Sequence, residues 1–114
     1  MVKVQDLKDK LNLKLICGEK GLDKEICGCY IGDLLSFVMS RISENYVWLT
    51  VMGNINSIAV ASLRDIPCII LVENSSLDCD AKDKAENENI AVLSSEKTSF
   101  DLSIEIAKLL SRAD

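Results

Sequence analysis

The sequence contains no histidine, one proline and few aromatic residues, which make up 4% of its 114 positions. Without histidine, the chain cannot form the Ser-His-Asp or Cys-His pairs of common hydrolases and transferases, and it has no imidazole ligand for a metal. Basic residues are also scarce, since 13 Lys and Arg stand against 18 Asp and Glu. A protein with a net charge of −5 lacks the basic surface that binds nucleic acids and anionic membranes. We therefore expect a binding or regulatory protein, with no catalytic residues, metal, cofactor, nucleic acid or membrane partner.

Long apolar runs are missing as well. The run Ile66–Val72 is far too short to cross a bilayer, and Met1–Lys10 is amphipathic and lacks the apolar core of a signal peptide.

The five cysteines are odd in number and irregularly spaced, so we expect free thiols in a cytoplasmic protein. A chain of 12.6 kDa buries about two thirds of its unfolded surface, enough for one core. We predict a single domain over residues 1–114.

The periodicity of apolar residues predicts alternating strands and helices. Strands are expected at 13–17, 26–31, 46–52, 68–72 and 90–93, and helices at 3–11, 33–42, 58–63, 78–88 and 99–111. The strands at 46–52 and 68–72 carry no charged residue, as expected for parallel strands covered on both faces. The Ala-rich helix at 58–63 is apolar enough to be buried. The pattern indicates an α/β fold with a mostly parallel central sheet of four to five strands flanked by helices.

Two polar turns follow the uncharged strands. Gly53-Asn54-Ile55-Asn56-Ser57 precedes a helix, and open α/β sheets bind ligands at such turns because free helix N–H groups attract phosphate. Glu73-Asn74-Ser75-Ser76 would lie at the same edge of a parallel sheet. Helix capping by Asn54 or Asn56 is the alternative explanation for the first turn. The candidate ligand-binding residues are Gly53, Asn54, Asn56, Ser57, Asn74 and Ser75.

The cysteine motif Cys27-Gly28-Cys29 permits two interpretations. If 26–31 is one strand, both thiols point to the same face, where with Cys17 they could hold a soft metal or exchange disulfides. The alternative is that these residues are small, half-buried side chains with no chemistry. Cys79, in a polar segment, is the better candidate for a reactive thiol.

Acidic residues are concentrated late in the chain. Residues 1–72 carry eight acids and eight bases, whereas residues 73–89 carry six acids and two bases. This segment is either a solvated helix face or a docking surface for a partner protein. Among the earlier acids, Asp33 is expected to cap the helix at 33–42 and Asp23 to lie in a turn, rather than to act as an acid or base.

The segment Leu22–Met39 resembles the signature of the DRTGG domain family. That signature has an Asp-Arg pair, an apolar residue, a Gly pair followed by Tyr, and then Asp-Leu-Leu-Ser. The matching residues are Asp23, Lys24, Gly28, Tyr30 and Asp33, with Lys24 where Arg is usual and Cys29 where the second Gly is usual. The following strand, Ala-rich helix and strand of the family resemble Tyr46–Thr50, Ile58–Leu63 and Ile69–Leu71, so the resemblance covers nearly the whole chain.

This resemblance implies a fold like the amino-terminal domains of HPr kinase/phosphorylase and, more distantly, of Mur ligases. Such domains accompany phosphotransacetylase modules, and nucleotide-binding CBS pairs in regulated pyrophosphatases, where they tend to dimerise. The expected function is therefore a non-enzymatic regulatory domain, a homodimer that binds a nucleotide or another phosphorylated small molecule. The alternative is an interaction module that docks a partner enzyme or kinase without a small ligand, through Tyr30–Met39 or the acidic helix.

Overall fold

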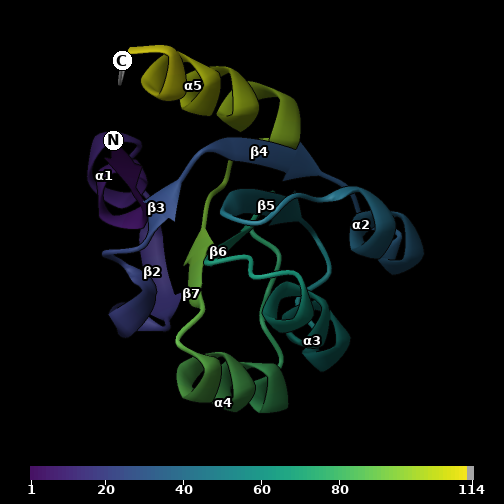
Figure 1. The fold of residues 1–114 in the computed structure, drawn as a ribbon. Helices are drawn as coiled ribbons and strands as arrows, with labels where there is room; N and C mark the ends of the chain where they lie inside the picture. The colour runs from purple at the N-terminus through teal and green to yellow at the C-terminus, as the bar shows by residue number, and fades with distance from the viewer. Residues whose placement is uncertain (113–114) are drawn as a thin grey trace.

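The computed structural model describes residues 1–112, and its centre is a five-stranded sheet in the order β2-β7-β6-β5-β4 (Figure 1). The strands β4 (Gly28–Ile31), β5 (Tyr46–Thr50), β6 (Cys68–Leu71) and β7 (Ala91–Ser94) are parallel. β2 (Lys14–Cys17) runs antiparallel to β7 at one end of the sheet. The prediction of an α/β fold with a mostly parallel central sheet is confirmed.

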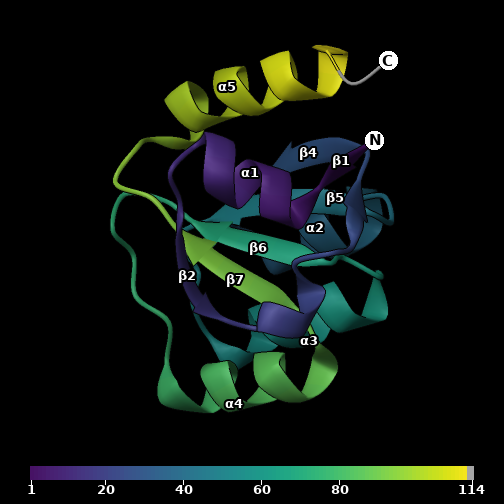
Figure 2. The same cartoon turned by 90° about the vertical axis from the view of Figure 1, so that its left-hand side faces the viewer.

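Helices cover both faces of this sheet (Figures 1 and 2). They are α1 (Val4–Lys10), α2 (Leu35–Arg41), α3 (Ile55–Leu63), α4 (Cys79–Glu88) and α5 (Ser99–Arg112), and a 3₁₀ turn lies at Glu19–Gly21. α1 and α5 bury Leu7, Leu102 and Ile106 in one core, and α2 and α3 bury Val38 and Ile58 in the other. In both views α5 lies beside β4, so the helix shields the strand at that end of the sheet.

The central strand β5 explains why its sequence has no charge. Val47 and Leu49 are fully buried in the core under α1 and α5, whereas Trp48 is fully buried in the core under α2, α3 and α4. The indole Nε1 of Trp48 donates a hydrogen bond of 2.9 Å to the carbonyl of Gly32. The largest core side chain therefore also fixes the loop that leaves β4.

The predicted strand at 26–31 is wrong in one respect, because the chain breaks at Cys27 into two strands. β3 (Glu25–Ile26) pairs antiparallel with a short strand that was not predicted, β1 (Val2–Lys3), and only β4 joins the main sheet. The backbone N–H of Cys27 donates to the carbonyl of Asn45 at 2.9 Å. Strands of two residues are too short to show the alternation of apolar and polar residues that predicts a strand, so the sequence does not reveal the break at Cys27.

Two helix predictions also need correction. α3 begins at Ile55, earlier than expected, and its last residue Leu63 is 71% exposed rather than buried. α2 is shorter than the predicted 33–42 because Leu34 is its N-cap in an extended conformation. Helix ends follow tertiary contacts that periodicity does not report.

The first and last described residues lie near each other. Met1 and Arg112 line the same hollow beside α1, together with Leu109 of α5. Figures 1 and 2 show the amino end of the chain and the last turn of α5 on one side of the molecule. Within residues 1–112, no helix combines the length and the apolar character needed to cross a bilayer.

Candidate functional site

The loops that follow the four parallel strands meet at one edge of the sheet, the carboxyl-end edge. Backbone hydrogen bonds tie neighbouring loops together, since Asn74 N–H donates to the carbonyl of Ser95 at 3.0 Å and Asp78 N–H to that of Gly53 at 2.8 Å. The antiparallel strand β2 begins at the same edge, with Lys14 paired with Ser94. The structure thus places both predicted turns, 53–57 and 73–76, at this edge, where α/β sheets commonly bind ligands.

The first turn is closed by its own contacts. A Cβ atom on Gly53 would lie 2.0 Å from the carbonyl oxygen of Ser76, so the two loops are in direct backbone contact. The Asn54 side chain accepts a hydrogen bond of 3.0 Å from Ser57 N–H, and the buried Ser57 hydroxyl donates to the carbonyl of Met52 at 2.6 Å. Asn54 is therefore the N-cap of α3, and the side-chain oxygens of Asn54 and Ser57 form hydrogen bonds within the turn.

The other candidate residues differ in their surroundings. Asn56 is exposed in the first turn of α3, and the hydroxyl of Ser75 donates to the carbonyl of Val72 at 2.7 Å. Asn74, in a left-handed conformation with φ of 58°, lines a hollow further along the edge. Of the six predicted residues, Asn74 is thus the one that lines this hollow.

That hollow has a volume of about 550 Å³, in the range of small-molecule sites. It lies between the end of α1, the start of β2 and the loops that follow β6 and β7. Its lining residues are Leu11, Asn12, Lys14, Asn74, Ser94, Ser95, Glu96 and Lys97. We call it the Lys14–Lys97 hollow.

The lining of the Lys14–Lys97 hollow supplies hydrogen-bond donors of the kind that anions require. Lys97 Nζ lies 2.6 Å from a carboxylate oxygen of Glu105 on α5, whereas Lys14 has no acidic side chain within 4.0 Å among residues 1–112. Amides and hydroxyls from Asn12, Asn74 and Ser94 complete the set. Because Lys97 is already paired with Glu105 and the lining also contains Glu96, Lys14 is, within the described residues, the unpaired ammonium group that could bind a phosphate or carboxylate ligand.

Sequence reasoning missed Lys14 and Lys97 for different reasons. Lys14 reaches the site because β2 pairs antiparallel with β7, and the sequence does not show that pairing. Lys97 lies in the loop after β7, so the rule that singled out the turns after β5 and β6 also applied there. The Ser94-Ser95 pair after the predicted strand 90–93 was the signal that could have found it.

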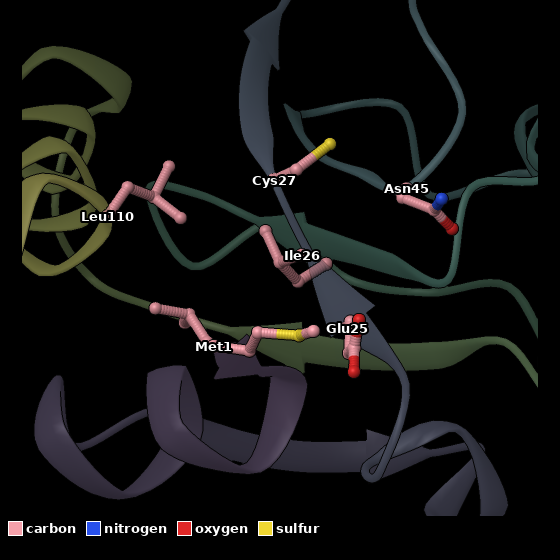
Figure 3. Close-up of a pocket in the computed structure, with 7 residues that line it drawn as sticks. Met1, Glu25, Ile26, Cys27, Asn45 and Leu110 are labelled. Carbon is pink, nitrogen blue, oxygen red and sulfur yellow. The ribbon is translucent and has the colours of Figure 1, made fainter. Parts of the chain in front are cut away.

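Two other hollows have the opposite charge character. One, of about 430 Å³, is shown in Figure 3, where Met1, Ile26, Cys27 and Leu110 surround it with Glu25 as its acid and with no basic residue in its lining. The other, of about 450 Å³, lies at the amino ends of β5 and β6, and its three acids outnumber its one lysine. Acidic side chains outnumber basic side chains in both linings, so the Lys14–Lys97 hollow suits an anion better than either of them.

The residues of the family signature hold elements together. Asp33 does not cap α2 as predicted, because its carboxylate accepts hydrogen bonds from the Thr50 hydroxyl at 2.7 Å and from Val51 N–H at 3.0 Å. Lys24 Nζ donates to the carbonyl of Asn89 at 2.8 Å, at the carboxyl end of α4, where a cation is favourable. Asp33 thus joins the loop after β4 to the end of β5, and Lys24 joins the start of β3 to α4.

Gly28 and Cys29, at the two positions of the signature's Gly pair, are also packed against neighbouring side chains. A Cβ on Gly28 would lie 2.4 Å from the ring of Tyr46, so the ring occupies the space that a side chain would need. Tyr30 packs against the core under α2, α3 and α4, and Asp23 is exposed. Cys29, which stands at the second glycine position, is half-buried against the core under α1 and α5.

The three cysteines considered for a metal or redox role are not brought together. Cys17 is buried in the core under α2, α3 and α4, Cys29 faces the opposite core, and Cys27 is exposed between β3 and β4. Burial raises the pKa of the Cys29 thiol to about 11, and burial with a smaller contribution from Glu86 raises the pKa of Cys17 to about 11. In the described part of the chain, no three Cys, Asp or Glu side chains are grouped so that they could hold a metal ion. Cys79 is exposed, and all five thiols are free.

Comparison with known proteins defines the class of the fold. No protein-family model matches the sequence, and no curated protein matches it either. Among solved structures, the fold is similar to the CBS and DRTGG domains of the regulatory region of a pyrophosphatase from Clostridium perfringens, complexed with its activator diadenosine tetraphosphate, with a TM-score of 0.67. The sequences are 15% identical, and the match covers 90% of this chain and 44% of that one. The protein therefore has a DRTGG-like fold and spans less than half of the chain it matches.

Proposed function

We propose that this protein is a non-enzymatic regulatory domain that binds a nucleotide or another phosphorylated small molecule and forms a homodimer. The observation that carries the ligand proposal is the Lys14–Lys97 hollow, which Lys14, Lys97 and Asn74 line at the carboxyl-end edge of the parallel strands. The contacts of Gly53, Asn54, Ser57 and Ser75 would hold the neighbouring turns in place. Five free thiols agree with a cytoplasmic location, where thiols stay reduced.

The fold comparison supports a regulatory role. The similar structure is the regulatory region of a pyrophosphatase and was solved with a nucleotide activator. The absence of histidine from this chain removes the commonest general base, which agrees with a domain that binds but does not catalyse.

Thermal unfolding in the presence of adenine and guanine nucleotides and of inorganic phosphate tests the ligand proposal. A ligand present at 100 times its dissociation constant stabilises the folded state by about 2.7 kcal/mol, which raises the unfolding midpoint measurably. The variants Lys14→Gln and Lys97→Gln should lose most of this stabilisation, each compared with its own midpoint without ligand. Lys84→Gln is the matched control, because Lys84 lies on α4 and pairs with Glu88 at 3.8 Å, away from the hollow.

Two results would overturn the ligand proposal. The first is that no nucleotide and no phosphate, at millimolar concentration, raises the unfolding midpoint. The second is that a nucleotide stabilises Lys14→Gln and Lys97→Gln as much as it stabilises the original protein, which would place the ligand elsewhere.

A second candidate function is an interaction module that docks a partner protein without a small ligand. The observation that favours it is the acidic face of α4, where Asp80, Asp83 and Glu86 lie on a helix whose buried side uses only Ala81 and Ala85. Neutralising these three acids to Asn or Gln should abolish capture of a basic partner enzyme or kinase. Unchanged recovery of that partner would exclude docking through α4.

A further inference from the structure

The side chain of Lys97 takes part in two sets of contacts. It lines the Lys14–Lys97 hollow, and its ammonium group also lies 2.6 Å from a carboxylate oxygen of Glu105 on α5. The described lining of the hollow does not include Glu105. The ammonium group of Lys97 therefore lies between the hollow and α5, where it can bind either an anion in the hollow or the carboxylate of Glu105.

The ion pair between Lys97 and Glu105 is the shortest of the three in residues 1–112. The other two have N–O distances of 3.7 and 3.8 Å. The second carboxylate oxygen of Glu105 is buried and has no hydrogen-bond partner among the described residues. Because a buried oxygen without a partner is costly, Glu105 depends on Lys97 to balance its charge. Loss of the ammonium group would make the present position of Glu105 less favourable.

The backbone at Lys97 is held in place, so the exchange of partners needs only the side chain. The carbonyl of Lys97 accepts a hydrogen bond of 3.0 Å from Glu73 N–H in the loop after β6. The next residue, Thr98, caps α5, since its hydroxyl accepts from Asp101 N–H at 3.2 Å. A lysine side chain is long and flexible, so its ammonium group can turn from Glu105 to the hollow without a change in this backbone.

α5 can carry the effect of this exchange away from the hollow. Figure 2 shows that the loop after β7 leads directly into α5, which then lies along β4. Leu102 and Ile106, on either side of Glu105 in the sequence, are fully buried in the core under α1 and α5. Glu105 thus lies in the part of α5 that docks on the sheet, and the loss of its partner weakens that docking.

We propose that Glu105 and an anion in the Lys14–Lys97 hollow compete for Lys97, so that occupancy of the hollow loosens α5. Lys14, which has no acidic partner among the described residues, binds the anion first. Lys97 then turns from Glu105 to the anion, because a phosphate carries more negative charge than a carboxylate. This inference rests on the ligand of the proposed function and adds how its binding is regulated and which helix responds to it.

Binding of ATP and of inorganic phosphate, at constant ionic strength, to the original chain and four variants tests the competition. Glu105→Gln removes the competing carboxylate and should bind both probes about 3- to 5-fold more tightly, the factor expected for a partly exposed ion pair. Glu88→Gln is the matched control, because it removes the same charge from an ion pair on α4 and should leave the affinity unchanged. Lys97→Gln and the double variant with Glu105→Gln should have equal affinities, because Glu105 acts only through Lys97.

Hydrogen exchange of the α5 amides tests the response of the helix. Saturation of the original chain with ATP should speed exchange at residues 102–110 about 3- to 5-fold, because the coupling between two competing contacts is reciprocal. In Glu105→Gln the same amides should exchange at the faster rate without ATP, and ATP should not speed them further.

The outcomes separate this inference from the proposed function. Tighter binding in Glu105→Gln but not in Glu88→Gln, with faster exchange of α5 in ATP, supports the competition. Equal affinities of the original chain and Glu105→Gln overturn the competition and leave the ligand proposal standing. A gain from Glu105→Gln that persists without Lys97 also overturns it, since the gain is then a general effect of charge. Unchanged exchange of α5 overturns the loosening of the helix. Failure of both probes to bind the original chain and all variants overturns both proposals.

Discussion

Replacing Asp33 by serine tests what the aspartate of the family signature does. The sequence predicts a helix N-cap, a position where serine and aspartate are equally good, so Asp33→Ser would leave stability unchanged. In the structure the carboxylate instead accepts from the Thr50 hydroxyl and from Val51 N–H. A serine hydroxyl lies one atom closer to the backbone and reaches neither partner, so Asp33→Ser should behave like Asp33→Ala.

The magnitude follows from the two hydrogen bonds and from their exposure. Hydrogen bonds to a charged group contribute about 1.5–3 kcal/mol each when buried, but Asp33 is exposed, and water can replace part of what is lost. We therefore expect a loss of about 1.5 kcal/mol in the free energy of unfolding for the pair. With an m-value of about 1.5 kcal/mol/M, the urea midpoint would fall by about 1 M.

A double-mutant cycle with Thr50→Val isolates the contact from other effects. Thr50 is 1% exposed and valine keeps its shape, so this change removes the hydroxyl with little change in packing. Urea unfolding of the two single variants and the double variant should give a coupling of about 1 kcal/mol. Wild-type stability in Asp33→Ser, or a coupling of zero, would refute the assignment of Asp33 as the link between the loop after β4 and the end of β5.

Three further outcomes can be checked by unfolding experiments. Gly53→Ala should lower the free energy of unfolding by about 2 kcal/mol, because its Cβ would lie 2.0 Å from the backbone oxygen of Ser76; wild-type stability would show that the two loops can separate. Burial raises the pKa of the Cys29 thiol from 9.0 to about 11, so this thiol ionises at a lower pH in the unfolded chain than in the folded one. The free energy of unfolding should therefore fall as the pH rises from about 9 to 11, and it should fall less in Cys29→Ala. An equal dependence of the free energy of unfolding on pH in the two proteins would contradict this. Lys24→Met should lower the midpoint slightly by removing the bond to the Asn89 carbonyl, and Lys24→Arg should restore it; a midpoint equal in all three proteins would mean that the bond contributes nothing.

The parallel sheet was predictable because burial on both faces leaves a strong pattern. β5 and β6 are uncharged because every residue from Val47 to Thr50 and from Cys68 to Leu71 is buried. The two-residue strands β1 and β3 leave no such pattern, since their register depends on the pairing of Val2 with Ile26 from distant parts of the chain. The local sequence therefore predicts the buried parallel strands β5 and β6 but not the short antiparallel strands β1 and β3.

The candidate site was predictable only in its location. The rule about carboxyl ends of parallel strands pointed to Asn54 and Asn74, and both lie at that edge. The rule cannot predict which turn leaves space for a ligand, because the backbone contact between Gly53 and Ser76 depends on how the two loops pack. It cannot supply Lys14 either, which comes from an antiparallel strand. For the same reason the capping role expected of Asp33 was wrong, since the position of Thr50 decides where the carboxylate binds.

The closeness of Met1 to Arg112 has a consequence for how this fold can be built into other chains. Because both residues line one hollow, a host polypeptide could enter and leave the fold at nearly the same point, without a long connection across its surface. A short Gly-Ser bridge between them should also allow circular permutation, with new ends opened in the exposed turn at 43–45. A permuted chain that still folds would show that the order of synthesis of β1 and α5 is not needed to assemble the sheet.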